Sequence, residues 1–205
     1  MKYGYLNLGQ VEAVVNKLGG MDGVNKFLRD EIIVSEPLRR WREENGVIYF
    51  SVNSDGATGE EWITRFESKG FRIGNYTKSV LHSKDFKPTN GIIYEIAVLK
   101  GKFFSISNRN TKAICQEAKN RKFSTPNTEV ACLIREKFSD KELEAMGLYW
   151  IVAMHEPIKD SDGYPRLLSA IRDDGGSWLG SSYDNFVYKW DYGGFAFVVS
   201  QVSSF

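Results

Sequence analysis

Residues 175–199 read GGSWLGSSYDNFVYKWDYGGFAFVV, and this run decides how the chain is interpreted. It opens on Gly175-Gly176-Ser177-Trp178 and closes on the β-prone run Gly194-Phe195-Ala196-Phe197-Val198-Val199. A strand-like stretch, residues 166–172, precedes it. Between the two landmarks, residues 179–192 follow neither the period of a helix nor that of a strand. We therefore predict long loops hung between two strands, which is where binding surfaces usually lie.

The composition of the chain changes near residue 157. Glu156 is the last glutamate, and residues 160–205 contain ten of the 28 aromatic side chains together with many Ser, Gly and Asp residues. Rings give a large contact area at low entropic cost and small polar residues adapt their hydrogen bonds, as in antibody paratopes. A β-rich subdomain with turn residues explains the same composition, and composition alone favours that plainer interpretation.

Upstream of the tail, periodicity and capping signals predict a mixture of helices and strands. Helices are expected at 11–18, at 22–29 with Phe27 and Leu28 inward, near 76–81 and at 111–122. Two further helices are predicted by capping boxes, one formed by Thr58 and Glu61 and the other by Ser139 and Glu142. Another helix is predicted to start at Thr125 and Pro126. Strands are expected at 32–35, 47–52, 92–99 and 148–154, with a charged turn at 39–46. Because these elements do not alternate regularly, we predict an α+β fold.

Charge and length restrict the function. The 205 residues carry 27 basic and 26 acidic side chains, a net charge of +1, which excludes a nucleic-acid binder that acts through bulk charge and leaves only a local patch open. The longest apolar run, 92–99, contains Glu95, so no membrane span is expected. The first residues lack a secretory signal, so we expect a cytoplasmic protein, with virion or cell-surface display left open.

The tail resembles a known family. The Gly-Gly-Ser-Trp motif, the Asn-, Ser-, Tyr- and Asp-rich stretch after it and the closing Gly-Phe-x-Phe-Val-Val strand look like the C-terminal end of a C-type-lectin-type domain. More specifically, they resemble the variable proteins of diversity-generating retroelements, and the formylglycine-generating-enzyme branch of that fold shares the same ending. The match covers roughly the last 40 residues, and Ala196 stands where many relatives carry Arg.

The resemblance implies a C-type-lectin-like fold with a small antiparallel sheet and long C-terminal ligand-binding loops. Residues 91–205 would form this domain, with a variable region at about 164–192, and residues 1–90 would be an N-terminal α/β extension. In this family an error-prone reverse transcriptase substitutes template adenines, which converts Asn codons chiefly to Tyr, Ser, Asp, Gly, Ile, Phe, Val or Leu. The implied function is a non-catalytic, receptor-like protein whose hypervariable surface binds a protein or a surface ligand.

Side chains reachable from an Asn codon define the implied ligand-binding set. These residues are Ser169, Ile171, Asp173, Asp174, Leu179, Ser181, Ser182, Tyr183, Asn185, Phe186, Tyr188, Asp191 and Tyr192. Trp and Lys are not reachable, so Lys189 is framework by this criterion. The wider implied framework is Gly175, Gly176, Trp178, Trp190, Gly194 and Phe195. Tyr183, Phe186, Tyr188 and Tyr192 would be the energetic anchors, since hot spots favour Tyr and Trp. Homo-oligomerisation would add avidity.

Two other interpretations stay open. The Tyr-rich tail would serve equally as a fixed docking surface of a structural or interaction protein with one partner. An enzyme that uses His155 and Glu156 for acid–base chemistry is the weaker alternative, because His82 is the only other histidine and no nucleophile motif occurs. The formylglycine-generating activity needs a cysteine pair near the C-terminal end, whereas Cys115 and Cys132 both lie upstream in helical patterns.

No cofactor and no metal are predicted. Asp160-Ser161-Asp162-Gly163 resembles the start of a calcium loop, but no later glutamate completes it, so a turn is favoured. The run Arg39-Arg40-Trp41-Arg42 is better explained as an ion-paired turn than as a nucleic-acid contact, because acidic residues surround it.

Overall fold

One mostly antiparallel sheet of nine strands organises the larger part of the chain. The computed structural model describes residues 7–33, 39–173, 175–184 and 189–203. It divides the chain into two units, Met1–Arg39 and Arg40–Phe205. The boundary lies at 39/40, whereas position 90/91, where we expect it, falls at the start of a strand inside the second unit. Residues 47–55 pair with residues 90–99, and residues 72–73 pair with 178–179, in one sheet. These pairings join residues 40–90 to the rest.

The first unit is a pair of short helices, α1 (Leu8–Lys17) and α2 (Met21–Leu28). Asn7 caps α1, and a Cβ on Gly23 would lie 1.5 Å from the carbonyl oxygen of Leu18, so α2 approaches the end of α1 closely only because residue 23 is Gly. Both helices are confirmed. The inward placement of Phe27 and Leu28 is wrong, because both side chains are exposed in this unit and two short helices have no interior deep enough to cover them.

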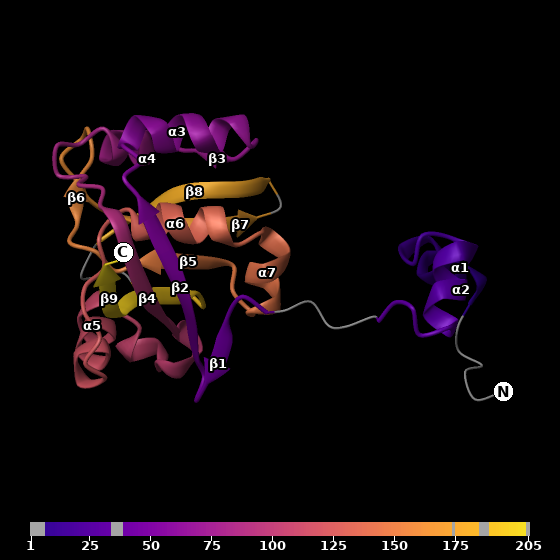
Figure 1. The fold of residues 1–205 in the computed structure, drawn as a ribbon. Helices are drawn as coiled ribbons and strands as arrows, with labels where there is room; N and C mark the ends of the chain where they lie inside the picture. Colours follow the sequence, from indigo (N-terminus) through magenta and orange to yellow (C-terminus); the bar gives the residue numbers. More distant parts are fainter. Residues whose placement is uncertain (1–6, 34–38, 174, 185–188, 204–205) are drawn as a thin grey trace. The chain divides into compact units, whose positions relative to one another are not determined.

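The second unit contains the sheet, in the order β1-β2-β4-β9-β5-β7-β8-β3, with β6 paired to β7 (Figure 1). Among the strands of the described residues, only β5 with β9 and β3 with β8 run parallel. The strands are β1 (Arg42–Glu44), β2 (Val47–Asp55), β3 (Arg72–Ile73), β4 (Asn90–Lys100), β5 (Trp150–Ala153), β6 (Ile158–Lys159), β7 (Pro165–Asp173), β8 (Gly176–Tyr183) and β9 (Gly194–Ser203). The fold is therefore mixed α and β, as predicted, but the sheet is large and open where a small one is expected.

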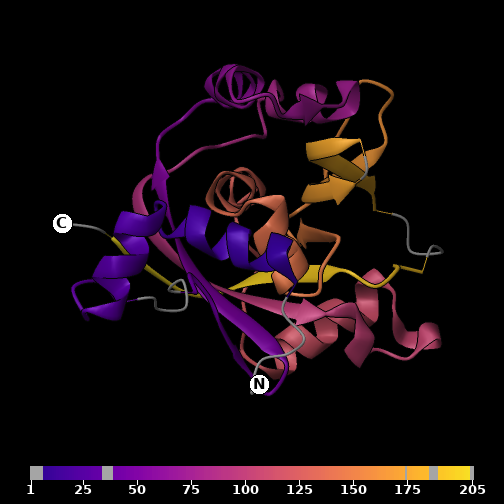
Figure 2. The ribbon, with the colours of Figure 1, turned by 90° about the vertical axis from the view of Figure 1, so that its right-hand side faces the viewer.

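Helices cover both faces of this sheet. On one side, α3 (Gly59–Ser68), α4 (Asn75–Leu81), α6 (Val130–Lys137) and α7 (Asp140–Ala145) pack on a core that contains Trp62, Phe66 and Ile134. On the other, α5 (Thr111–Asn120) packs on Phe195 and Phe197, after the short 3-10 turns η1 (Gly101–Phe103) and η2 (Ile106–Asn108). Figures 1 and 2 show α3 and α4 at one end of this unit and α5 at the other. No helix among the described residues has the length and apolar character needed to cross a membrane.

Local capping signals position several of these helices. The capping boxes Thr58–Glu61 and Ser139–Glu142 are both confirmed, at the starts of α3 and α7. The start predicted at Thr125 and Pro126 is wrong, because α6 begins at Val130. Glu129 is the N-cap residue and makes no side-chain capping bond, while Asn127 Oδ1 accepts a hydrogen bond from the N–H of Glu129 at 3.1 Å in the turn before the helix.

The tail contains a strand that the sequence pattern does not predict. Gly176–Tyr183 forms β8, paired with β7 in register from Arg166↔Tyr183 to Asp173↔Gly176, where loops are expected from residue 179 onward. The run Gly-Ser-Trp-Leu-Gly-Ser-Ser-Tyr lacks the β-branched residues that mark strands, so only pairing with β7 makes it one. Residues 179–183, which we expect in a loop, therefore belong to a strand.

Candidate functional site

Three tyrosines and one arginine form a surface at the β7–β8 hairpin beside α4. We call Tyr76, Tyr164, Arg166 and Tyr183 the tyrosine–arginine surface. The guanidinium carbon of Arg166 lies 4.3 Å from the ring centre of Tyr76 and 5.8 Å from that of Tyr183. Tyr164 meets Tyr183 edge to face, with ring centres 5.6 Å apart. All three tyrosines are exposed, so a ligand would meet rigid rings that are already ordered.

Asp160 holds the arginine in place. Its Oδ2 accepts a hydrogen bond from Arg166 Nε at 2.6 Å, and its Oδ1 accepts from the N–H groups of Asp162 and Tyr164. Burial raises the pKa of Asp160, but these hydrogen bonds outweigh that effect, so the net pKa is lowered and the carboxylate stays ionised. The segment 160–163 is thus a turn that orients Arg166. The described residues hold no group of three or more His, Cys, Asp or Glu side chains that could bind a metal.

Two hollows flank the stack of Tyr76 and Arg166. One, of about 300 Å³, is lined by Tyr164, Arg166 and Tyr183. The other, of about 330 Å³, lies between the start of α4 and the β7–β8 hairpin, and its lining includes Asn75, Tyr76, Asp173, Trp178 and Ser181. Each hollow is large enough for one side chain or one ring of a ligand. Together they form an extended, aromatic and mostly uncharged contact surface.

Trp178 and Asp173 are linked to each other at the rim of the second hollow. The indole N–H of Trp178 donates to Asp173 Oδ1 at 3.0 Å, and the N–H of Gly175 donates to the same oxygen at 2.8 Å. Gly176 has φ +118°, in the region that favours Gly, and forms the tight end of the hairpin. Gly175 and Gly176 therefore shape the turn, while Asp173 bonds within it.

The structure separates the thirteen predicted ligand-binding residues into groups. Ile171, Asp173, Ser181 and Tyr183 line the two hollows, and Ser182 is half-buried beside them on β8. Ser169 and Leu179 are completely buried, and we correct their assignment to a solvent-facing patch: Leu179 packs in the core, and Ser169 lies between Val152 of β5 and Gly180 of β8. Asp174, Asn185, Phe186 and Tyr188 lie outside the described residues.

Asp191 and Tyr192 lie elsewhere, next to α5. The guanidinium carbon of buried Arg109 is 4.0 Å from the ring centre of Tyr192, and the Arg109 carbonyl accepts a hydrogen bond from the N–H of Trp190 at 2.8 Å. Trp190 packs against Trp150 and Phe195, with ring centres 5.8 and 5.7 Å apart. Gly194 pairs with Lys100 of β4 and with Ile151 of β5. Trp190, Gly194 and Phe195 thus anchor the segment that leads into β9.

His155 occupies a structural position. It is 3% exposed, and the N–H of Leu168 donates to its Nε2 at 2.9 Å, so Nδ1 carries the proton and donates to the carbonyl of Glu156 at 2.7 Å. Burial lowers the pKa of His155 to about 4. A neutral imidazole with both nitrogens occupied ties β5 to β7, and it is not placed for acid–base work on a solvent-borne substrate.

Sequence reasoning missed Asn75 and Tyr76. They belong to a short helix about 90 residues before the hairpin and meet it only because β3 pairs with β8 and delivers α4 beside it. The Tyr76 hydroxyl hydrogen-bonds Asp162, and this bond raises the pKa of Tyr76. No periodicity or motif signals that contact; an exposed Tyr at the start of a predicted helix is the only hint.

The comparisons with known proteins are negative. No protein-family model, no curated protein and no solved structure matches this chain.

Proposed function

We propose that this chain is a non-catalytic binding protein that recognises a protein or surface ligand through the tyrosine–arginine surface and its two hollows. The convergence of four predicted ligand-binding residues with Tyr76 and Arg166 around these hollows carries the proposal. The rings are held by Asp160 and by each other, so little ordering entropy is lost when a ligand binds. The buried, fully bonded His155 speaks for recognition rather than chemistry.

The surface can be tested by removing its rings. The triple variant Tyr76→Ser, Tyr164→Ser and Tyr183→Ser is compared with wild type on an array of immobilised cell-surface proteins and polysaccharides. Tyr149→Ser is the matched control, because the exposed Tyr149 also stacks on an arginine, Arg172 at 4.4 Å, but lies outside both hollows. Wild type and control should bind the same array members and the triple variant none. Equal binding by all three would contradict the proposal.

We further propose that a retroelement diversifies this binding surface. This proposal predicts that natural copies of this gene differ at adenines in the codons of Ile171, Asp173, Ser181 and Tyr183, and that Trp178 and Trp190 stay constant. Ser169 and Leu179 should vary little even though their codons are reachable, because both side chains are buried. Deep sequencing of the 3′ end across a source population measures this. Uniform variation along the whole gene would contradict it and favour the alternative, a fixed docking surface for one partner.

A further inference from the structure

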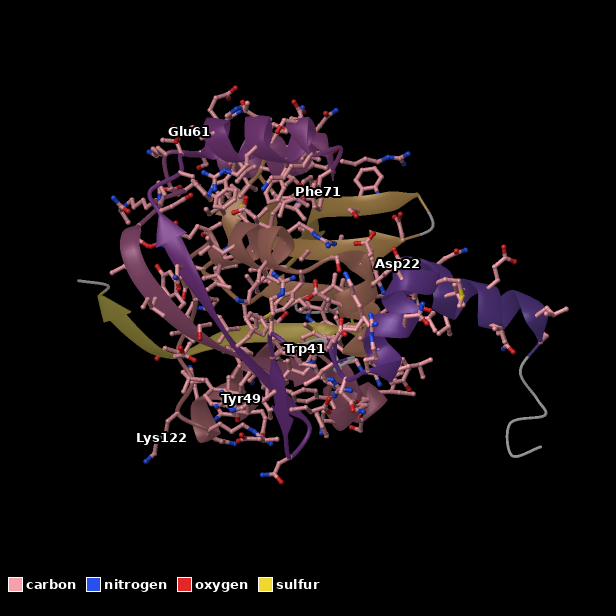
Figure 3. The ribbon with its side chains drawn as sticks, turned by 45° about the vertical axis from the view of Figure 1, so that its right-hand side comes forward. Asp22, Trp41, Tyr49, Glu61, Phe71 and Lys122 are labelled. Atoms are coloured by element: carbon pink, nitrogen blue, oxygen red, sulfur yellow. The ribbon has the colours of Figure 1, made fainter. Side chains whose placement is uncertain are left out.

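Both helices of the first unit carry apolar side chains at the same spacing. In each helix these side chains fall at i, i+3, i+6 and i+7, which places them in one stripe along the helix. The stripe of α1 contains Leu8, Val11, Val14 and Val15, and Leu18 continues it just past the helix end. The stripe of α2 contains Met21, Val24, Phe27 and Leu28. Outside both stripes lie the charged side chains of the two helices, which are Glu12, Lys17, Asp22 and Lys26 (Figure 3).

The two helices do not cover each other's stripes. Among residues 7–33, the part of this unit that the structure describes, only Gly23 is buried. Val15, Leu18 and Val24 are half-buried, close to the turn at which the helices meet and from which they diverge (Figures 2 and 3). The other stripe residues are exposed, by 42% to 89%, and these are Leu8, Val11, Val14, Met21, Phe27 and Leu28. The unit therefore has an apolar side, formed by the two stripes, that its own residues leave open.

The first unit is also small for a structure that folds alone. It spans Met1–Arg39, and chains below about 40 residues usually need a disulfide, a metal or association with another chain. Residues 1–39 contain no cysteine and no histidine, so a disulfide or a metal held by those side chains does not stabilise it. Association through the apolar side is the route that remains.

Charge favours a second copy of the chain over a membrane as the occupant of this side. The unit has five basic residues, Lys2, Lys17, Lys26, Arg29 and Arg39, and five acidic ones, Glu12, Asp22, Asp30, Glu31 and Glu36. Helices that lie on membranes have a polar face rich in Lys and Arg, which this balance does not provide. Two copies of a neutral unit meet without net repulsion, and their four apolar stripes are what the core of a four-helix bundle requires.

We propose that residues 7–33 bind a second copy of this chain. The apolar sides of two α1–α2 pairs would pack on each other across a two-fold axis and form a four-helix core. A two-fold interface uses the same surface of both copies, so this one side is sufficient. Each dimer would then carry two tyrosine–arginine surfaces, and a ligand that presents repeated sites would be bound with avidity. The inference itself rests on the first unit and does not depend on the proposed ligand-binding function.

Light scattering coupled to size-exclusion chromatography of the full chain tests this proposal. Wild type should have twice the chain mass of 23.3 kDa at about 100 μM, a concentration above the dissociation constants of most stable interfaces. Val11→Glu with Leu28→Glu puts one charge on each stripe and should weaken association roughly tenfold or more, because unpaired charges would be buried in the core. Ile106→Glu with Tyr149→Glu is the matched control: it makes the same charge change at two exposed side chains of the second unit and should stay dimeric.

A conservative variant separates lost association from a need for particular side chains. Val11→Leu with Leu28→Met keeps both stripes apolar and should remain dimeric. Wild type with the mass of one chain, a dimeric Glu pair on the stripes, or equal dissociation of the control would each overturn the proposal. Binding of monomeric wild type to vesicles of phosphatidylcholine and phosphatidylglycerol would overturn it in favour of a membrane. The triple tyrosine variant should be dimeric like wild type, so failure of the ligand-binding function would leave this result unchanged.

Discussion

The hydroxyl of Thr111 donates a hydrogen bond to the carboxylate of Asp184 at 2.9 Å, across 73 positions of the chain. The same oxygen accepts a hydrogen bond from the indole N–H of Trp190 at 3.1 Å. Asp184 directly follows β8, and Trp190 lies four residues before β9. One side chain at the start of α5 therefore bonds to Asp184 and to Trp190, on both sides of residues 185–188, which lie outside the described structure.

Thr111→Val should destabilise the protein by about 1–3 kcal/mol, because it leaves the buried Asp184 carboxylate and the Trp190 N–H without their shared partner. Thr111→Ser keeps the hydroxyl and should cost much less. Urea denaturation followed by Trp fluorescence measures both variants. A Thr111→Val variant as stable as wild type would contradict a contribution of these hydrogen bonds.

Arg135 is the second long-range link. Its side chain is fully buried, contacts Asp140 at 2.9 Å and donates to the carbonyls of Ile171 and Phe138. Arg135→Met should cost about 3 kcal/mol, at the lower end for a broken buried pair because Asp140 is partly exposed. Arg40→Met is the control: it removes an exposed ion pair to Glu142, on the same α7, and should cost less than about 1 kcal/mol. Equal losses in chemical denaturation would contradict the structural role of Arg135.

Acid should weaken the fold through His155. Its pKa is lowered to about 4 in the folded chain, below the unfolded value of 6.5, so folding favours the neutral ring. The stabilisation is complete above pH 6.5 and is lost as the pH falls from 6.5 to 4, by about 3 kcal/mol in total. Imidazole signals in an NMR titration measure this directly, with His82→Gln identifying which signal belongs to His155. A His155 midpoint near 6.5 would contradict the buried, neutral tautomer.

Gly59 sets the distance between α3 and α4. A Cβ there would lie 1.9 Å from the carbonyl oxygen of Leu81, a backbone atom that cannot turn aside. Gly59→Ala should therefore cost about 1–3 kcal/mol and displace α4, which carries Tyr76. Gly74 is the N-cap residue of α4 and the nearest atom to a Cβ there is 3.9 Å away, so Gly74→Ala meets no clash and should cost less than Gly59→Ala, limited to the weaker N-cap preference of Ala. A neutral Gly59→Ala would show that the two helices are not packed this closely.

Predictions from the sequence are accurate where a structure depends on interactions between near neighbours in the chain, and they fail where it depends on distant ones. The capping boxes at Thr58 and Ser139 depend on residues three positions apart, and both helices begin where those signals lie. The buried strands β4 and β5 were also found, because continuous apolar runs bury on both faces of a sheet. By contrast, β8 consists of small residues, and its extended form comes from its partner β7, so no local pattern could reveal it.

The candidate site divides in the same way. The sequence alone could select Ile171, Asp173, Ser181 and Tyr183 as ligand-binding residues. The codon criterion needs only the type of each residue and its place in the tail. Ser169 and Leu179 meet the same criterion and are buried, although each shares a strand face with a residue of that group, Ile171 on β7 and Ser181 on β8. What covers each position along the strand is decided only by the tertiary packing. Tyr76 meets no such criterion and is nevertheless at the centre.

The sequence by itself determined the helix starts, the apolar strands and a tail rich in rings and small polar residues, because capping, periodicity and composition act over a few neighbouring positions. The tertiary structure decided the rest. Pairing of β3 with β8 brought Tyr76 to Arg166, and one hydroxyl of Thr111 joined Asp184 to Trp190. These contacts join residues about 70 to 110 positions apart, and only the free energy of burying a common core holds such distant segments together.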